Sequence, residues 1–339
     1  MNPDLQSFTA QGEDVRLLLD QLRNRKLVHA YLVSGEKGTG KRTLAALAAA
    51  SLLCGAGGDR PCGTCRDCLL AASLEHPDMV VIRRGIPIAP DVKKDRATIP
   101  VDDIREMIRI CGESTLVGNA RVVLLFDADK MTAQAQNCLL KTLEEPPDNT
   151  YLFLVTDHPD ALLTTVISRC RPIRLKAWDD RMIHGILLDR GVAPERAKRA
   201  VQAAGGSIGR AIELSSDEAY WARRNEAISL FFATSASGIL AASNAWKDRR
   251  EEGNELLDIL ESLLRILVGV RMGQLPEGML SEYPDRWKRF AREAALPDIA
   301  ALSDAVSAAR KQLQFSVNFQ AVLEQLLFVF VGEGNKWST

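Results

Sequence analysis

A glycine-rich run that ends in a lysine, GEKGTGK at residues 35–41, is the first stretch of the chain whose residue types could do chemistry. Residues 29–34 before it have strand character, and residues 43–50 after it are strong helix formers. Between a strand and a helix, glycines let backbone N–H groups surround a phosphate, and the helix N-terminus adds partial positive charge. The spacing therefore predicts a phosphate-binding loop. Its predicted phosphate contacts are Gly35, Gly38, Gly40 and Lys41.

The residue after the lysine departs from this pattern. The motif requires Ser or Thr, whose hydroxyl ligates Mg²⁺, and this chain has Arg42. Thr43 comes one residue late, which is about 100° around a helix, so its hydroxyl points elsewhere. A guanidinium at the metal position would also repel the cation. The loop thus indicates a fold more strongly than it indicates ATP hydrolysis, and the sequence leaves open whether nucleotide still binds.

Four cysteines follow the loop within fifteen positions, three of them at Cys-x-x-Cys spacing. Four thiols at this spacing suit tetrahedral Zn²⁺, and because no fifth ligand stands nearby we expect a closed, structural site. The alternatives are disulfides, which a reducing cytosol disfavours, or buried thiols without a ligand. The predicted zinc ligands are Cys54, Cys62, Cys65 and Cys68. The three other cysteines lack such spacing and are expected in the core: Cys111, Cys138 and Cys170.

An apolar run that ends in Asp127 lies downstream of the loop and is similar to a Walker B segment. Active motors of this type follow that aspartate with a glutamate, which activates water. Here the next residue is Ala128. Asp127 could still face a metal, but the water-activating carboxylate is missing.

Composition limits the other functions. With 339 residues the chain is long enough for two or three domains, and a formal net charge of -1 gives no global attraction to nucleic acid. The N-terminus lacks the basic and apolar regions of a signal peptide, and residues 256–270 and 321–331 are too charged or too short to span a bilayer. We therefore expect a cytoplasmic protein that does not enter a membrane.

Hydrophobic periodicity predicts an α/β first half and a helical second half. Expected strands lie at residues 29–34, 79–82, 121–127, 151–156 and 172–175, and expected helices at 13–25, 100–111, 132–143, 159–167, 178–190 and 194–204. From residue 220 onward only helices are expected.

These pieces together resemble a known family. The loop, the four cysteines, the run NCLLKTLEEPP at residues 137–147 and the tripeptide Ser168-Arg169-Cys170 are similar to the clamp-loader subunits of bacterial DNA polymerase III, which are AAA+ proteins. The resemblance covers roughly residues 8–215. Two subunit types share these features, the gamma/tau motor and delta-prime, and the departures at Arg42 and Ala128 resemble delta-prime.

The resemblance implies an AAA+ P-loop domain with a parallel sheet and a zinc module, a helical lid and an all-α collar. Carried to this chain, these are residues 1–177 with the module at 54–68, then 178–215 and 216–339. It also implies a hetero-pentamer with gamma/tau and delta subunits, acting indirectly on the sliding clamp and primed DNA.

In that family the arginine of the Ser-Arg-Cys tripeptide reaches the ATP of the neighbouring subunit, which here implies Arg169. A guanidinium supplied from outside stabilises the charge on the γ-phosphate, so a chain without hydrolysis of its own can serve its neighbour. The family's motors also place a nucleotide-sensing arginine two residues after a lid serine. This chain has Gly209 there, with Arg210 one step late, so the role of Arg210 stays open.

Two other functions are weighed against this one. An active gamma/tau-type ATPase would need a stand-in for the carboxylate that Ala128 lacks. A stand-alone zinc-dependent nucleic-acid binder would need a basic stripe with interleaved aromatic residues, and the sequence has none.

Overall fold

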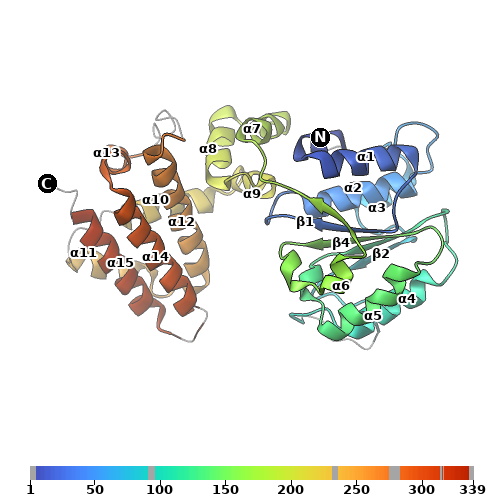
Figure 1. Ribbon diagram of the computed structural model, residues 1–339. Coiled ribbons are helices and arrows are strands. Elements are labelled where there is room, and N and C mark those ends of the chain that lie inside the picture. The colour runs from blue at the N-terminus through green and yellow to red at the C-terminus, as the bar shows by residue number, and fades with distance from the viewer. Residues whose placement is uncertain are drawn as a thin grey trace. The chain divides into compact units, whose positions relative to one another are not determined.

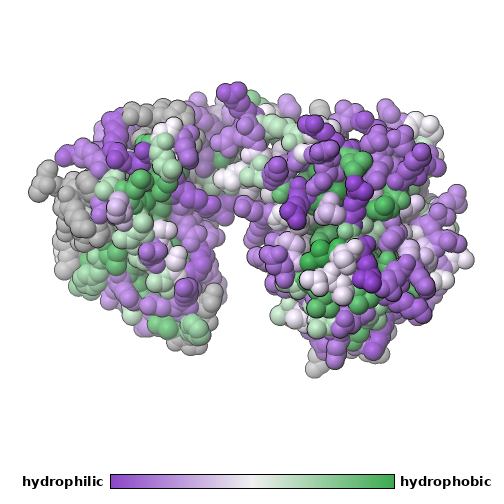
Figure 2. All heavy atoms as spheres, in the orientation of Figure 1, coloured by the Kyte–Doolittle hydropathy of each residue, from purple (hydrophilic) through white to green (hydrophobic). Residues whose placement is uncertain are grey.

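The computed structural model describes residues 5–90, 96–230, 236–274, 283–313, 315 and 317–335. The chain divides into two compact units, Met1–Ser215 and Ser216–Thr339. Figure 1 shows the first as a sheet with helices on both faces and the second as helices alone. Hydrophilic residues cover most of the visible face of each unit, interrupted by smaller hydrophobic groups (Figure 2).

The sheet of the first unit is parallel throughout and has the strand order β2-β3-β4-β1-β5. Parallel sheets are usually covered on both faces, so their strands are continuous apolar runs. The strands are β1 (Ala30–Ser34), β2 (Met79–Ile82), β3 (Arg121–Leu125), β4 (Thr150–Thr156) and β5 (Arg171–Arg174). The expected parallel sheet flanked by helices is confirmed.

Helices of the first unit cover the two faces of the sheet (Figure 1). On one face lie α1 (Glu13–Asn24), α2 (Lys41–Leu53) and α3 (Arg66–Ala72). On the other face lie α4 (Val101–Cys111), α5 (Ala133–Glu144) and α6 (Thr164–Ile167). Three short helices follow β5 in the same unit: α7 (Asp180–Asp189), α8 (Pro194–Ala204) and α9 (Ile208–Leu214).

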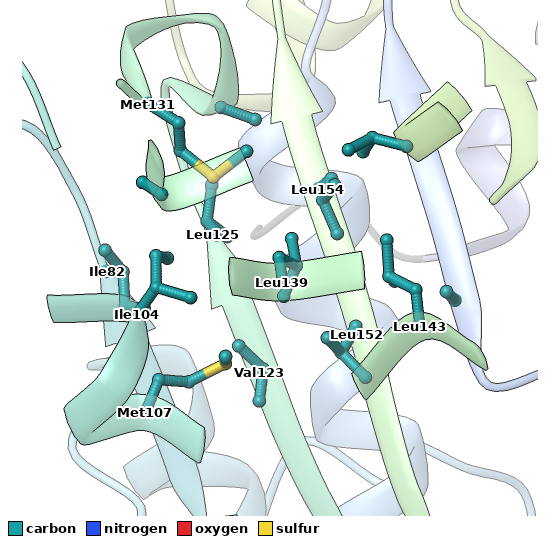
Figure 3. Packing of buried hydrophobic residues seen from close by; sticks show 14 of the residues in the cluster. Ile82, Ile104, Met107, Val123, Leu125, Met131, Leu139, Leu143, Leu152 and Leu154 are labelled. Atoms are coloured by element: carbon teal, nitrogen blue, oxygen red, sulfur yellow. The ribbon is translucent and has the colours of Figure 1, made fainter. Parts of the chain in front are cut away.

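A hydrophobic cluster between the sheet and the helices α4, α5 and α6 forms the core beside the candidate site. Figure 3 shows Leu139 of α5 over the sheet, near Leu125 of β3 and Leu154 of β4. Each of these leucines is completely buried, and full burial of such a side chain stabilises the fold by about 1.5–3 kcal/mol. This core holds β3, β4 and α5 in place. Several candidate site residues stand at the ends of these three elements.

Among the residues described, the second unit contains helices joined by short connections, and no strands. Its helices are α10 (Glu218–Leu230), α11 (Ala236–Trp246), α12 (Gly253–Arg271), α13 (Asp285–Glu293), α14 (Leu296–Leu313) and α15 (Phe319–Asn335). Five leucines at helical spacing on α12 are buried: Leu256, Leu260, Leu263, Leu264 and Leu267. Among the residues described, no helix is long and apolar enough to cross a membrane.

A buried carboxylate holds the loop between α4 and β3. Asp78 is completely buried and accepts backbone hydrogen bonds from Leu116, Val117 and Gly118, the last two at 2.9 and 2.8 Å. Burial raises the pKa of Asp78, but these three N–H groups outweigh it and hold the pKa below its ordinary value. Asp78 therefore stabilises the fold as the carboxylate.

We expect Asp78→Asn to lower the free energy of unfolding by about 2–3 kcal/mol at pH 7, because buried N–H donors lose a charged acceptor. A depressed carboxyl pKa stabilises the fold above the unfolded value of about 4 and loses that contribution as the pH falls through the folded value. The difference from the unmodified chain should therefore shrink below about pH 4. Urea titrations at pH 7 and pH 3.5 measure it, with exposed Asp148→Asn as the control. A difference of equal size at both pH values would contradict the charge-based account.

Candidate functional site

The glycine loop connects β1 to α2, as the sequence predicts. Three of its glycines have positive φ: +149° at Gly35, +80° at Gly38 and +93° at Gly40. A Cβ atom at Gly35 would lie 2.5 Å from the carbonyl oxygen of Leu175, so only glycine fits there. The loop therefore has the backbone that a phosphate cradle requires.

The N-terminus of α9 packs directly on this loop. The Gly209 N–H donates to the Gly38 carbonyl at 2.9 Å, and a Cβ atom at Gly38 would overlap Ser207 Oγ. A Cβ atom at Gly209 would lie 3.3 Å from the Gly38 Cα, so a side chain there would press on the loop. The Trp178 indole also donates to the Thr39 carbonyl at 2.8 Å. Contacts from α9 and from Trp178 therefore hold the glycine loop in this conformation.

Lys41 is buried at the start of α2, with an exposed fraction of 5%. Its Nζ donates to the Glu36 carbonyl at 2.6 Å and pairs with Asp157 Oδ1 at 2.7 Å. Asp157 directly follows β4, and the sequence interpretation did not include it. The sequence showed an aspartate directly after a predicted strand, but not that this strand neighbours β1 in the sheet. The loop lysine is satisfied by groups of this chain.

Arg42 contacts the aspartate of the Walker B-like segment. Its Nη2 lies 2.6 Å from Asp127 Oδ1, and its guanidinium carbon lies 5.3 Å from the centre of the Phe126 ring. Asp127 adopts a left-handed conformation at φ 55°, which turns it out of the strand. A guanidinium therefore neutralises the carboxylate that would otherwise attract a divalent cation.

Ala128 is completely buried and belongs to the hydrophobic core. A glutamate at this position would have to bury a charge among Leu125, Met131 and Leu154, which is costly without a partner. The nearby Asp129 does not substitute for it, because its carboxylate accepts from Thr156 Oγ1 at 2.8 Å and pairs with Lys130 at 2.9 Å. Neither Ala128 nor Asp129 therefore offers an unpaired carboxylate next to Asp127.

The structure brings the four predicted zinc ligands together between α2 and α3. Their sulfur atoms all lie within 4.8 Å of one another, and the pairs Cys54–Cys65 and Cys62–Cys68 are 3.9 Å apart. A disulfide needs about 2 Å, whereas tetrahedral zinc with Zn–S bonds of about 2.3 Å needs sulfurs roughly 3.8 Å apart. The donor set fits zinc and not disulfides.

Backbone N–H groups prepare this cluster for negative charge. Cys65 N–H and Cys68 N–H each donate to the sulfur three residues earlier, at 3.4 Å. Backbone hydrogen bonds from Thr64 and Cys65 lower the pKa of Cys62 to about 6, while burial raises the pKa of Cys68. Zinc, when bound, would supply the positive charge that keeps all four thiolates deprotonated. Of the other cysteines, Cys111 and Cys170 are buried and Cys138 is half-buried, as expected of core residues.

Arg169 lies between α6 and β5 and is held on its own unit. Its Nε donates to Glu144 Oε1 at 2.9 Å, its Nη2 pairs with the same oxygen, and its Nη1 donates to the Thr165 carbonyl at 2.9 Å. The side chains of Arg169 and Glu144 are 34% and 51% exposed, so solvent or a partner can reach the pair. The sequence interpretation quoted Glu144 within a motif but did not pair it with Arg169.

The residues around the glycine loop and Arg169 lie at opposite edges of the sheet, that is, at opposite ends of its parallel strands. The loop follows β1, Asp127 follows β3 and Asp157 follows β4, so they share the carboxyl edge. Arg169 stands two residues before β5, which is parallel to β1, and so lies at the amino edge. A strand of five residues such as β1 spans about 16 Å.

Similarity to known proteins identifies the family of this chain. The family described as DNA polymerase III, delta subunit, matches residues 10–179, which is half of the chain. The chain belongs to this family. It is 29% identical to DNA polymerase III subunit delta' of Bacillus subtilis over 328 residues, which cover 94% of this chain and 95% of the relative. It is 40% identical to the subunit of the same name from Pseudomonas aeruginosa over 147 residues, 42% of this chain and 41% of the relative.

The resemblance predicted from the motifs is thereby confirmed. Among solved structures, a DNA polymerase III gamma subunit-related protein from Thermotoga maritima is similar, with a TM-score of 0.50, 15% identity and coverage of 94% of this chain and 99% of that one. This likeness bears on the fold alone, and it agrees with the AAA+ class expected from the sequence. This member of the delta-subunit family is a clamp-loader subunit of DNA polymerase III.

Proposed function

We propose that this chain is a non-hydrolysing, stator-like subunit of the clamp loader that supplies Arg169 to the ATP held by a neighbouring subunit. The observation that carries the proposal is the position of Arg169 at the amino edge of the sheet, while the chain's own glycine loop lies at the carboxyl edge. An arginine placed there cannot reach a phosphate on its own loop. It is suited to a nucleotide on another chain.

The state of the chain's own loop supports the same proposal. Lys41 is paired with Asp157, Arg42 is paired with Asp127, and Ala128 is buried in the core. The loop region therefore lacks a metal-holding hydroxyl and a water-activating carboxylate, and Lys41 and Arg42 already have carboxylate partners. We infer that it holds the domain together rather than hydrolysing ATP. The predicted phosphate contacts at Gly35, Gly38, Gly40 and Lys41 remain proposals for nucleotide binding without turnover.

The assembly proposed for the chain is a hetero-pentamer with gamma/tau and delta subunits, which loads the sliding clamp on primed DNA during replication. In this proposal residues 178–215 act as a lid, residues 216–339 join the collar of the ring, and Zn²⁺ on the four cysteines stabilises the first unit. Arg210 has no assigned role. The alternative is a working motor of the gamma/tau type. Such a motor would need the metal-holding hydroxyl and the water-activating carboxylate that this loop region lacks.

The experiment that tests this function compares the chain alone with the assembled loader. Purified chain mixed with delta and gamma/tau subunits should co-elute with them, and the chain alone should show no steady ATP turnover. Lys41→Ala removes the ion pair with Asp157 and should lower the stability of the first unit. Complexes that still assemble with this variant should hydrolyse ATP at the unmodified rate, since the loop of this chain contributes no hydrolysis. Turnover by the chain alone that disappears in Lys41→Ala would contradict the proposal and favour the motor.

A further inference from the structure

Two N–H groups of Arg169, rather than one, donate to the Glu144 carboxylate. The carboxylate oxygen Glu144 Oε1 takes both Nε–H and Nη2–H, which form the side edge of the guanidinium. The Thr165 carbonyl takes an Nη1–H. Nη1 also donates to Ser168 Oγ at 3.5 Å. A guanidinium has five N–H donors in a fixed plane, so the second Nη2–H stays directed away from the side chain. The end of the fork can bind an oxygen while Glu144 keeps the side edge.

The backbone on both sides of the pair is fixed by the core. Val166 and Cys170 flank Arg169 and are buried, and Gln136 of α5 accepts the Leu163 N–H at 2.7 Å, which fixes the start of α6. Glu144 follows the buried Leu143 on the same α5. Both partners are therefore carried by rigid elements of one core, and the guanidinium is the movable part between them.

The position of Glu144 is electrostatically unfavourable by itself. It is the last residue of α5, where the partial negative charge of the helix C-terminus disfavours a carboxylate. Glu145 and Pro146 follow, and a proline disfavours helical backbone in the residue before it, so the helix ends there. The cation that offsets the Glu144 charge is Arg169, 25 residues away in the sequence.

We propose that Glu144 is a positioning residue for Arg169: it holds the side edge of the guanidinium so that the free end points toward the nucleotide of a neighbouring subunit. This inference depends on the proposed function, because it assigns a role to Glu144 only if Arg169 acts on that nucleotide. Positioning removes the need to order a long side chain during the reaction, and its loss lowers the rate without changing how tightly ATP binds.

The test uses the loader assembled from purified subunits and measures ATP turnover against ATP concentration. Glu144→Ala in this chain should lower the maximal turnover that depends on Arg169 by about two- to fivefold, with the half-saturating ATP concentration unchanged. Glu144→Gln, which keeps the shape and loses the charge, should fall between. Glu145→Ala is the matched control, since it removes an exposed carboxylate one position away and should leave turnover unchanged.

The decisive comparison is the double variant. In an Arg169→Ala background, Glu144→Ala should have no further effect, because the group that it positions is gone. A further loss in that background, or wild-type or faster turnover in Glu144→Ala alone, would overturn the positioning role. If Arg169→Ala itself leaves turnover unchanged, the proposed function fails, so the two failures are distinguishable. Gel filtration and thermal unfolding of each variant show that it folds and assembles.

Discussion

Replacing Arg169 by alanine in the assembled clamp loader is expected to slow hydrolysis at the adjoining ATP site by about 10³-fold or more, while the ring still assembles. The transition state of phosphoryl transfer places negative charge on the γ-phosphate oxygens, and a planar, permanently charged guanidinium stabilises it. The other ATP sites of the complex should keep their own rates. Total turnover should therefore lose the share of one site, which a single-turnover assay resolves as a missing fast phase.

The control for this experiment is Arg171→Ala, which removes an exposed arginine at the same edge of the sheet, two positions away. This control tests whether loss of any positive charge near the neighbouring subunit is sufficient to slow ATP hydrolysis. We expect normal turnover from Arg171→Ala and normal gel-filtration behaviour from both variants. Equal rates for Arg169→Ala and the unmodified chain would remove the basis of the proposed function.

Removal of zinc should have the largest effect on stability. Metal analysis of the purified chain is expected to give one Zn²⁺ per chain, and Cys62→Ser combined with Cys65→Ser should abolish it. Structural zinc contributes about 10 kcal/mol or more to small zinc-dependent folds, and each kcal/mol shifts the midpoint of a unit of this size by about 2–4 °C. We therefore expect the double variant to unfold at least about 20 °C lower.

Cys138→Ser is the control for the zinc prediction, because this half-buried thiol lies outside the cluster. It should keep the full zinc content. A content below about half a Zn²⁺ per chain, in protein purified without any chelator, would reject the metal site. In that case the short sulfur–sulfur distances would reflect only the packing of α2 against α3.

Local patterns were sufficient for most of the first unit. The predicted strand at residues 79–82 and the predicted helix at residues 194–204 match β2 and α8 to the residue. The single helix predicted at residues 159–167 was wrong: a short 3-10 turn, Pro159–Ala161, precedes α6. Leu162 packs into the core and Leu163 bonds the side chain of Gln136, and these contacts across the fold override local helix propensity.

Some features of the candidate site were likewise predictable from the sequence, and others were not. The cysteine cluster was predictable because all four ligands lie within fifteen residues, where spacing alone limits the geometry. The sequence showed that Arg42 and Ala128 depart from the pattern of active motors, but not that Arg42 pairs with Asp127, 85 residues away. The pairs of Lys41 with Asp157 and of Arg169 with Glu144 were equally hidden, because each depends on which strand ends meet at one edge of the sheet.

The most direct test of the central claim is a structure of the assembled loader trapped with ADP and beryllium fluoride, which imitates the bound γ-phosphate. The account predicts that the end of the Arg169 guanidinium lies within hydrogen-bond distance, about 3 Å, of a fluoride on the neighbouring subunit, with Glu144 still on its side edge. An Arg169 guanidinium that lies far from every trapped nucleotide would contradict this prediction.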